Sequence, residues 1–180
     1  MSFPAHLLDY DVVDAKFSAA LSSVVIVSDT PSNTLHIYDV GTAVDRAVPL
    51  PAVPVAVAID VTGTMAAVAY DAHVSWVDLQ AGVVKTTCDD TAYAYDVALS
   101  STGIAYVVPA LDEADSLHAV TFSSCSESVP STWLFSGSHV ALHPSEKALF
   151  AANFDTATSV TRCDLTSSPI ACGDAEGATT

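Results

Sequence analysis

Three polar residues recur at one position of a repeated strand and could together bind a ligand. Four similar apolar strands can be aligned on Phe17, Ile59, Leu99 and Leu142. The residues three positions before these are Asp14, Ala56, Asp96 and His139. If the four strands surround one axis, two carboxylates and an imidazole would face a single water-filled channel. Such a group could bind a divalent cation or a polar ligand. The alternative is that these side chains line a solvated channel mouth, where they avoid desolvation.

The four cysteines predict disulfide bonds. Cys163 and Cys172 flank the turn in CDLTSSPIAC, so a hairpin would place them on paired strands. A bridge forms there if the two Cα atoms lie within about 7 Å. A second bridge, between Cys88 and Cys125, would link neighbouring repeats, and the alternative is four free thiols. An even number of cysteines suits an oxidising compartment, and the absence of a CxxC pair gives a zinc site little support.

Motifs of the common catalytic classes are absent from the sequence. It contains no G-x-S-x-G, no H-E-x-x-H and no glycine-rich phosphate loop. His36 and His118 occupy equivalent points of separate repeats, so we expect them to be spread around a ring rather than to share one ion. These observations favour a protein that is not an enzyme and has no cofactor, with a divalent cation in the channel as the alternative.

A fourfold repeat of short strands positions these residues. The strands that open the repeats are aligned on Phe17, Ile59, Leu99 and Leu142, at intervals of 42, 40 and 43 residues. Each is followed by a turn, a second apolar strand, a third strand and a weaker fourth. Four short strands at a period of about 40–45 residues are the spacing of a β-propeller blade. We therefore expect an all-β fold with one domain over residues 1–180, and blades at about 12–54, 55–93, 94–136 and 137–176.

Turn residues mark the strand ends. Gly63 and Gly103 stand where the first hairpin of a blade must reverse. Asp39, Asp78 and Asp164 recur at the end of the third strand, which predicts a turn capped by the aspartate side chain.

The repeats resemble those of the bacterial YVTN-type propeller proteins. Residues 150–153, Phe-Ala-Ala-Asn, are the closest match to the tetrapeptide that names the family, and Asp78-Leu79 and Asp164-Leu165 match its Asp-Leu strand ending. The resemblance covers essentially the whole chain and implies a ring of six to eight blades. No pairing of Gly-His with Trp-Asp occurs, so propellers of the Trp-Asp type rank lower.

Four blades are fewer than this resemblance implies. An open arc would expose the apolar faces of its first and last sheets, which soluble proteins avoid. Three arrangements stay open: additional blades from a longer chain, a homodimer in which two copies close an eight-bladed ring, and a closed four-bladed ring.

The charge of the chain limits its partners. Lys and Arg number 5 and Asp and Glu number 21, for a formal net charge of −16. This excess repels phosphate backbones and anionic membrane surfaces, so nucleic acid is not expected as a partner. No apolar run reaches 18 residues, so we expect no membrane insertion. No signal peptide is visible, but the cysteines favour an extracellular or periplasmic location.

The expected function is a non-catalytic binding or scaffold propeller within a larger bacterial exported or surface protein. It would contact a protein or a small polar ligand through loops on one face of the ring. Tyr93 and Tyr95 are candidate contact residues, and the loops concerned are residues 29–33, 89–95, 111–115 and 154–158. The alternative, suggested by lactonases among similar propellers, is a hydrolase in which Asp14, Asp96 and His139 hold a cation that polarises a carbonyl group.

Overall fold

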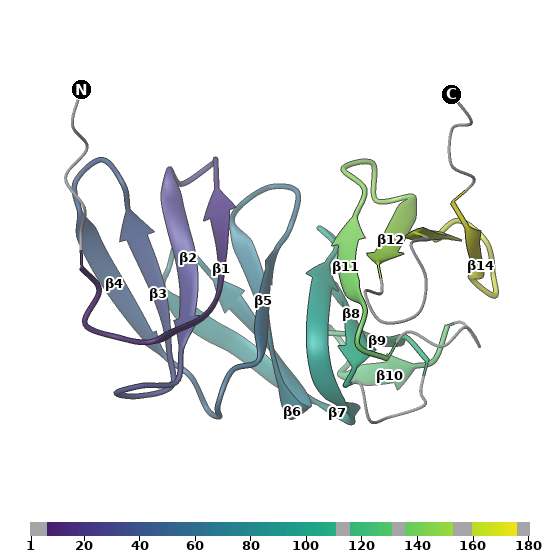
Figure 1. Cartoon of the computed structure of the whole chain (residues 1–180), viewed down its shortest axis with the longest axis horizontal. Coiled ribbons are helices and arrows are strands. Elements are labelled where there is room, and N and C mark those ends of the chain that lie inside the picture. Colours follow the sequence, from purple (N-terminus) through teal and green to yellow (C-terminus); the bar gives the residue numbers. More distant parts are fainter. Residues whose placement is uncertain (1–6, 111–115, 131–135, 153–159, 176–180) are drawn as a thin grey trace.

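The computed structural model describes residues 7–110, 116–130, 136–152 and 160–175, and every regular element in these residues is a β-strand (Figure 1). The N-terminal sheet contains β1 (Val12–Ser18), β2 (Ser23–Ser28), β3 (Thr34–Asp39) and β4 (Val44–Pro49), paired antiparallel in that order. The C-terminal sheet contains β11 (His139–Leu142), β12 (Ala148–Ala152), β13 (Val160–Asp164) and β14 (Ala171–Asp174), paired in the same way. In the described part of the chain, no helix is long and apolar enough to cross a membrane.

The middle of the chain forms one sheet of six strands that contains two blades. Its order is β10-β9-β8-β7-β6-β5, and its strands are β5 (Ala56–Ile59), β6 (Met65–Asp78), β7 (Val83–Leu99), β8 (Ile104–Pro109), β9 (His118–Thr121) and β10 (Ser126–Ser128). β6 includes a tight turn at Ala72, where φ is 63°. The N–H of Leu79 donates to the carbonyl of Thr64 at 3.0 Å, so the two arms of β6 are the second and third strands of one blade.

β7 continues from one blade into the next. It pairs with β6 over residues 83–93 and with β8 over residues 94–99. The prediction of a loop at residues 89–95 was wrong, because these residues belong to β7. The reason is visible in the burial of side chains, which alternates along residues 88–96, so the even-numbered residues face inward as in any half-buried strand.

The four inner strands stand next to one another around the centre of the arc. β1 packs beside β5, β5 beside the second half of β7, and that half beside β11. Figure 1 shows the N-terminal sheet at the left of the view and the C-terminal sheet at the right, with β5 and β7 between β1 and β11. β11 does not pack along β1 in this way within the described residues, so the arc is open.

Each pair of neighbouring blades encloses its own apolar cluster. In β6, Val68 and Tyr70 face the N-terminal blade, whereas Ala67 and Ala69 face the third blade. Alternate side chains of one strand therefore enter different interfaces, which is why the sequence of such a strand is an uninterrupted apolar run. The third cluster, between the last two blades, includes Leu149. Burial of valine- and alanine-rich faces thus stabilises the stacking of the blades.

The predicted turn chemistry is confirmed. Asp39 Oδ1 accepts the N–H groups of Gly41 and Thr42 at 2.9 and 2.8 Å. Asp78 and Asp164 use Oδ1 in the same way, each accepting an N–H two or three residues ahead at 2.9 Å. The hydrogen bonds from Thr42 and Gly41 hold the pKa of Asp39 below its ordinary value.

Glycine is required in the first hairpin turn of the second blade. Gly63 has φ of 75°, and a Cβ at this residue would lie 2.9 Å from the Cβ of Ala20 in the neighbouring blade. A side chain would therefore be strained by both the backbone and the contact. The turn is held against the first blade by the Ser18 hydroxyl, which donates to the carbonyl of Gly63 at 2.6 Å.

Candidate functional site

The structure places Asp14 in a hydrogen-bonded link between two blades. Its Oδ1 accepts the N–H of Ala15 at 2.7 Å, and its Oδ2 accepts the N–H of Val57, on the inner strand of the next blade, at 2.9 Å. Lys16 Nζ lies 3.0 Å from both carboxylate oxygens. The carboxylate is therefore used to join β1 to β5.

Asp96 repeats this arrangement between the third and fourth blades. Its Oδ1 accepts the N–H of Val97 at 2.8 Å, and its Oδ2 accepts the N–H of Val140 at 2.9 Å. His139 Nδ1 lies 3.2 Å from the same Oδ2, and the His139 ring is tilted against Tyr95 at a centroid distance of 5.2 Å. The structure thus brings Asp96 and His139 together.

Asp14 does not join Asp96 and His139 in a cation-sized group. Within the described ranges, only one set of three or more His, Cys, Asp or Glu residues has its ligand atoms all within 4.8 Å of one another, and Asp14, Asp96 and His139 do not belong to it.

The two tyrosines predicted as contact residues differ in exposure. Tyr93 is 56 % exposed on β7, whereas Tyr95 is half-buried against the cluster between the last two blades. The predicted loops at residues 111–115 and 154–158 lie outside the described residues.

The predicted Cys163–Cys172 disulfide is present, and Cys88 and Cys125, whose pairing the sequence left open, are bonded as well, so no cysteine is free. Cys163 and Cys172 are direct partners in the β13–β14 ladder, with Cα atoms 4.0 Å apart. Cys88 of β7 is bonded to Cys125 in the turn between β9 and β10, with Cα atoms 5.1 Å apart. The second bridge joins the outer strand of the second blade to the third blade.

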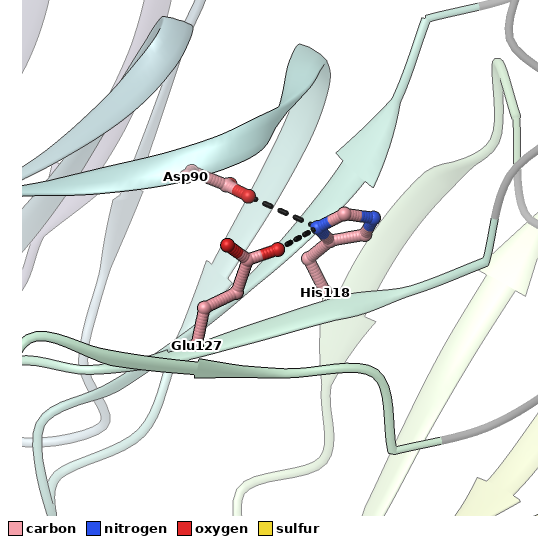
Figure 2. Close-up of side chains that lie close together, drawn as sticks. All are labelled: Asp90, His118 and Glu127. Carbon is pink, nitrogen blue, oxygen red and sulfur yellow. Dashed lines mark hydrogen bonds and ion pairs between the residues drawn. The ribbon is translucent and has the colours of Figure 1, made fainter.

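The one cation-sized group contains Asp90, His118 and Glu127, from β7, β9 and β10 (Figure 2). His118 Nδ1 lies 3.0 Å from Asp90 Oδ1 and 2.6 Å from Glu127 Oε1. Figure 2 shows the two carboxylates approaching the same ring nitrogen from different strands. Asp90 and His118 are buried, with 4 % and 2 % of their surface exposed, and Glu127 is half-buried. The strands thus bring two carboxylates and an imidazole into a site that is largely closed to water.

Hydrogen bonds satisfy only some of the carboxylate oxygens of Asp90 and Glu127. Asp90 Oδ1 also accepts the N–H of Ala92 at 3.2 Å, and the Thr91 hydroxyl donates to Glu127 Oε1 at 2.6 Å. Asp90 Oδ2 is buried and has no hydrogen-bond partner. The Nδ1 of His118 faces two carboxylate oxygens, which share its one N–H. Chemically, such a site suits a shared proton or a cation.

A related pair occurs in the first blade. His36 Nδ1 lies 2.7 Å from Asp45 Oδ2, and its Nε2 lies 3.2 Å from the Ser28 hydroxyl. The ring of Tyr10 stacks on His36 at 3.7 Å. In both blades the acidic residue follows the histidine by nine positions, a spacing that could have revealed the pairs from sequence. The third blade differs because a carboxylate, that of Asp90, comes in from β7.

A cavity opens at the ends of the inner strands. Its volume is about 460 Å³, and all four blades contribute to its wall. The wall includes the four residues on which the repeats were aligned, Phe17, Ile59, Leu99 and Leu142. Phe17 is 60 % exposed, whereas Leu99 is buried. The cavity is therefore a mainly apolar recess on the axis of the arc, with Asp60, Thr62 and His143 among its polar lining residues. It lies at the opposite ends of the inner strands from Asp14 and Asp96.

Comparison with known proteins identifies the fold. No family model and no curated protein matches the chain. Among solved structures, it is similar to hydrazine synthase of Kuenenia stuttgartiensis, with 18 % identity over 90 % of this chain and 49 % of that one. It is also similar to the Cps50 (Swd1) β-propeller domain of Myceliophteria thermophila, with 14 % identity over 93 % and 56 %, and to U3-55K, with 11 % identity over 93 % and 53 %. The TM-score is 0.70 in all three comparisons.

The chain spans about half the length of these neighbours. At such low identity the likeness establishes the fold and nothing finer. With the described sheets, it confirms the predicted all-β architecture: the chain has the β-propeller fold, present here as an open arc.

Proposed function

We propose that this protein is a non-catalytic binding scaffold of the YVTN type that holds a protein partner in its axial cavity. The observation that carries this proposal is the mainly apolar recess of about 460 Å³ to which all four blades contribute. Recesses of this size accept the apolar side chains that anchor protein complexes.

The rim of the cavity has the composition of a contact surface. Phe17 and Val61 are 60 % and 55 % exposed, so two apolar side chains are already presented to solvent at its edge. Lys16, which forms an ion pair with Asp14, also lines the cavity. Burial of such exposed apolar groups favours association. A partner segment with an apolar anchor would match this rim.

The opposite face offers a second place for contact. Tyr93 is exposed there, near the starting end of an inner strand, and tyrosine is enriched at protein interfaces. A small polar ligand beside Asp96 and His139 would also bind at this end. The two faces can be told apart by substitution because Phe17 and Tyr93 lie at opposite ends of the inner strands.

A peptide selection tests the proposal. Phage-displayed random peptides would be selected on the immobilised chain and their affinity measured for the wild type, Phe17→Ser and Tyr93→Ala. We expect the selected peptides to contain an apolar anchor, to lose at least tenfold in affinity for Phe17→Ser, and to bind Tyr93→Ala normally. Peptides that depend on Tyr93 instead would move the contact to the opposite face. Failure to select any peptide would contradict a binding role for the cavity.

The lactonase-like alternative requires Asp14, Asp96 and His139 to share a cation. The two carboxylates each accept two backbone N–H groups, one of them from the next blade. This arrangement supports a scaffold role for Asp14 and Asp96. Stoichiometric metal that is lost on Asp96→Ala would favour the hydrolase.

We also propose that the arc is part of a complete ring in an oxidising, extracytoplasmic setting. The open arc and the half-length match to its structural neighbours support additional blades, from a longer chain or from a second copy. The two disulfides are compatible with an extracellular or periplasmic location. Light scattering distinguishes the arrangements: a compact dimer supports closure by a second copy, and a stable monomer argues against it.

A further inference from the structure

We propose that Asp90, His118 and Glu127 bind a divalent transition-metal ion, and that the Cys88–Cys125 disulfide preorganises this site. The three ligands come from β7, β9 and β10, so the ion would join the strand shared by two blades to the outer part of the third blade. The site is separate from the axial cavity and from the Asp96–His139 pair.

The ligand atoms already lie close enough to surround one ion. His118 Nδ1 is 3.0 Å from Asp90 Oδ1 and 2.6 Å from Glu127 Oε1. A tetrahedral Zn²⁺ with bonds of about 2.1 Å holds its ligands about 3.4 Å apart. The carboxylates would therefore move outward by less than about an ångström on binding, which the half-buried Glu127 allows. The Thr91 hydroxyl, 3.4 Å from His118 Nδ1, or a water molecule could complete the coordination.

The unpartnered oxygen of Asp90 is the observation that points to an ion. The side chain of Asp90 is 1 % exposed, and its Oδ2 has no hydrogen-bond partner. A buried carboxylate oxygen without a partner costs free energy, and a second carboxylate beside it adds repulsion. A divalent cation would balance both charges and so stabilise a buried carboxylate whose second oxygen hydrogen bonds leave unsatisfied.

The disulfide sets the distance between two of the ligands. Cys88 precedes Asp90 by two residues on β7, so these two side chains lie on the same face of that strand. Cys125 stands in the turn that leads into β10, two residues before Glu127. The Cα atoms of the two cysteines are 5.1 Å apart. The covalent bond therefore holds the segments that carry Asp90 and Glu127 together whether or not an ion is bound. A ligand set fixed in this way loses less conformational freedom on binding.

The donor set favours zinc over calcium. Imidazole with two carboxylates is a ligand set found for Zn²⁺, whereas Ca²⁺ takes six to eight oxygens. The first blade provides a matched control, because His36 and Asp45 form the same pair and no third carboxylate joins them among the residues that the structure describes. The ring of Tyr10 is stacked on His36 there. This pair should not bind a metal ion.

The test is calorimetric titration of the chelator-treated, disulfide-bonded protein with ZnCl₂, with CaCl₂ as a comparison. We expect one high-affinity Zn²⁺ per chain and no comparable binding of Ca²⁺. Asp90→Asn and Glu127→Gln should each weaken Zn²⁺ binding by at least about tenfold, whereas Asp45→Asn should bind as the wild type does. Circular dichroism confirms that each variant is folded, and Co²⁺ absorption in the visible region reports direct coordination.

A second pair of variants tests the role of the disulfide. The double variant Cys88→Ser/Cys125→Ser should bind Zn²⁺ more weakly by roughly tenfold or more, and Cys163→Ser/Cys172→Ser should bind it normally. Absence of one-to-one binding, or equal losses in Asp90→Asn and Asp45→Asn, would overturn the metal site. Unchanged affinity in the folded Cys88→Ser/Cys125→Ser variant would overturn the preorganisation by the disulfide.

Discussion

The carboxylate of Asp96 joins two neighbouring blades, because its Oδ2 accepts the N–H of Val140 at 2.9 Å from 44 residues away. Asp14 makes the same bond to Val57, 43 residues ahead. Each aspartate also accepts the N–H of the residue that follows it. An aspartate at this position of the inner strand therefore forms a hydrogen bond to the next blade at two places in the arc.

Loss of this link of hydrogen bonds between blades should destabilise the protein. Asp96→Ala removes the acceptor of two N–H groups near the axis, and we expect the free energy of unfolding to fall by roughly 2–3 kcal/mol. Asp89→Ala is the control because the Asp89 side chain is 97 % exposed, and its effect should stay within about 0.5 kcal/mol. Urea denaturation followed by circular dichroism measures both. Equal effects of the two substitutions would contradict the link.

The Cys163–Cys172 bridge should stabilise the last blade. It closes a short loop between β13 and β14, with a sequence separation of 9 residues. The chain-entropy model assigns such a loop about 2–3 kcal/mol. Cys163→Ser/Cys172→Ser should lower the urea midpoint accordingly under oxidising conditions. A midpoint unchanged from that of the oxidised wild type would mean that the β13–β14 ladder holds without the bridge.

Alkaline pH should destabilise the fold through Tyr70. Burial raises the pKa of Tyr70 to about 12 from 10.0, with Ser75 opposing the shift. Between these values the unfolded chain releases a proton that the folded chain keeps, so the free energy of unfolding falls as pH rises from 10 to about 12. The slope from one such group reaches at most about 1.4 kcal/mol per pH unit. Tyr70→Phe should show a shallower slope in urea denaturation over this range, and an identical slope would contradict the assignment.

Two residues at equivalent strand positions should differ sharply in their effect on stability. Phe17 is 60 % exposed and Leu99 is 2 % exposed, although both line the cavity. Phe17→Ser should change the free energy of unfolding by less than about 1 kcal/mol, whereas Leu99→Ala should lower it by about 2–5 kcal/mol. Thermal or urea unfolding measures the free energy of unfolding of both variants. A large loss for Phe17→Ser would mean that this ring supports the fold rather than contact with a partner.

The sequence predicts what depends on local periodicity. Runs of apolar residues at a regular interval predicted the strands, and Asp39, Asp78 and Asp164 predicted capped turns that the structure confirms. The spacing of Cys163 and Cys172 predicted their pairing for the same reason, since a hairpin brings its two strands together.

Contacts between blades are less visible in the sequence. Asp14 and Asp96 were correctly aligned with each other, but the amide that each one bonds lies more than forty residues away. Asp90 lies outside the aligned positions, in a segment that resembled a polar loop. Its inward direction follows from the two-residue alternation of β7, which includes Cys88, Ala92 and Ala94 and could have been recognised.

The continuity of β7 also determines how the arc would come apart under mechanical load. Because one strand supplies the edge of the second blade and the inner strand of the third, these blades cannot separate without bending β7 or breaking one of its two ladders. The Cys88–Cys125 bond resists the same separation. Tension applied to the two ends of the chain would therefore peel away the first and last sheets and leave the central pair as the last part to yield.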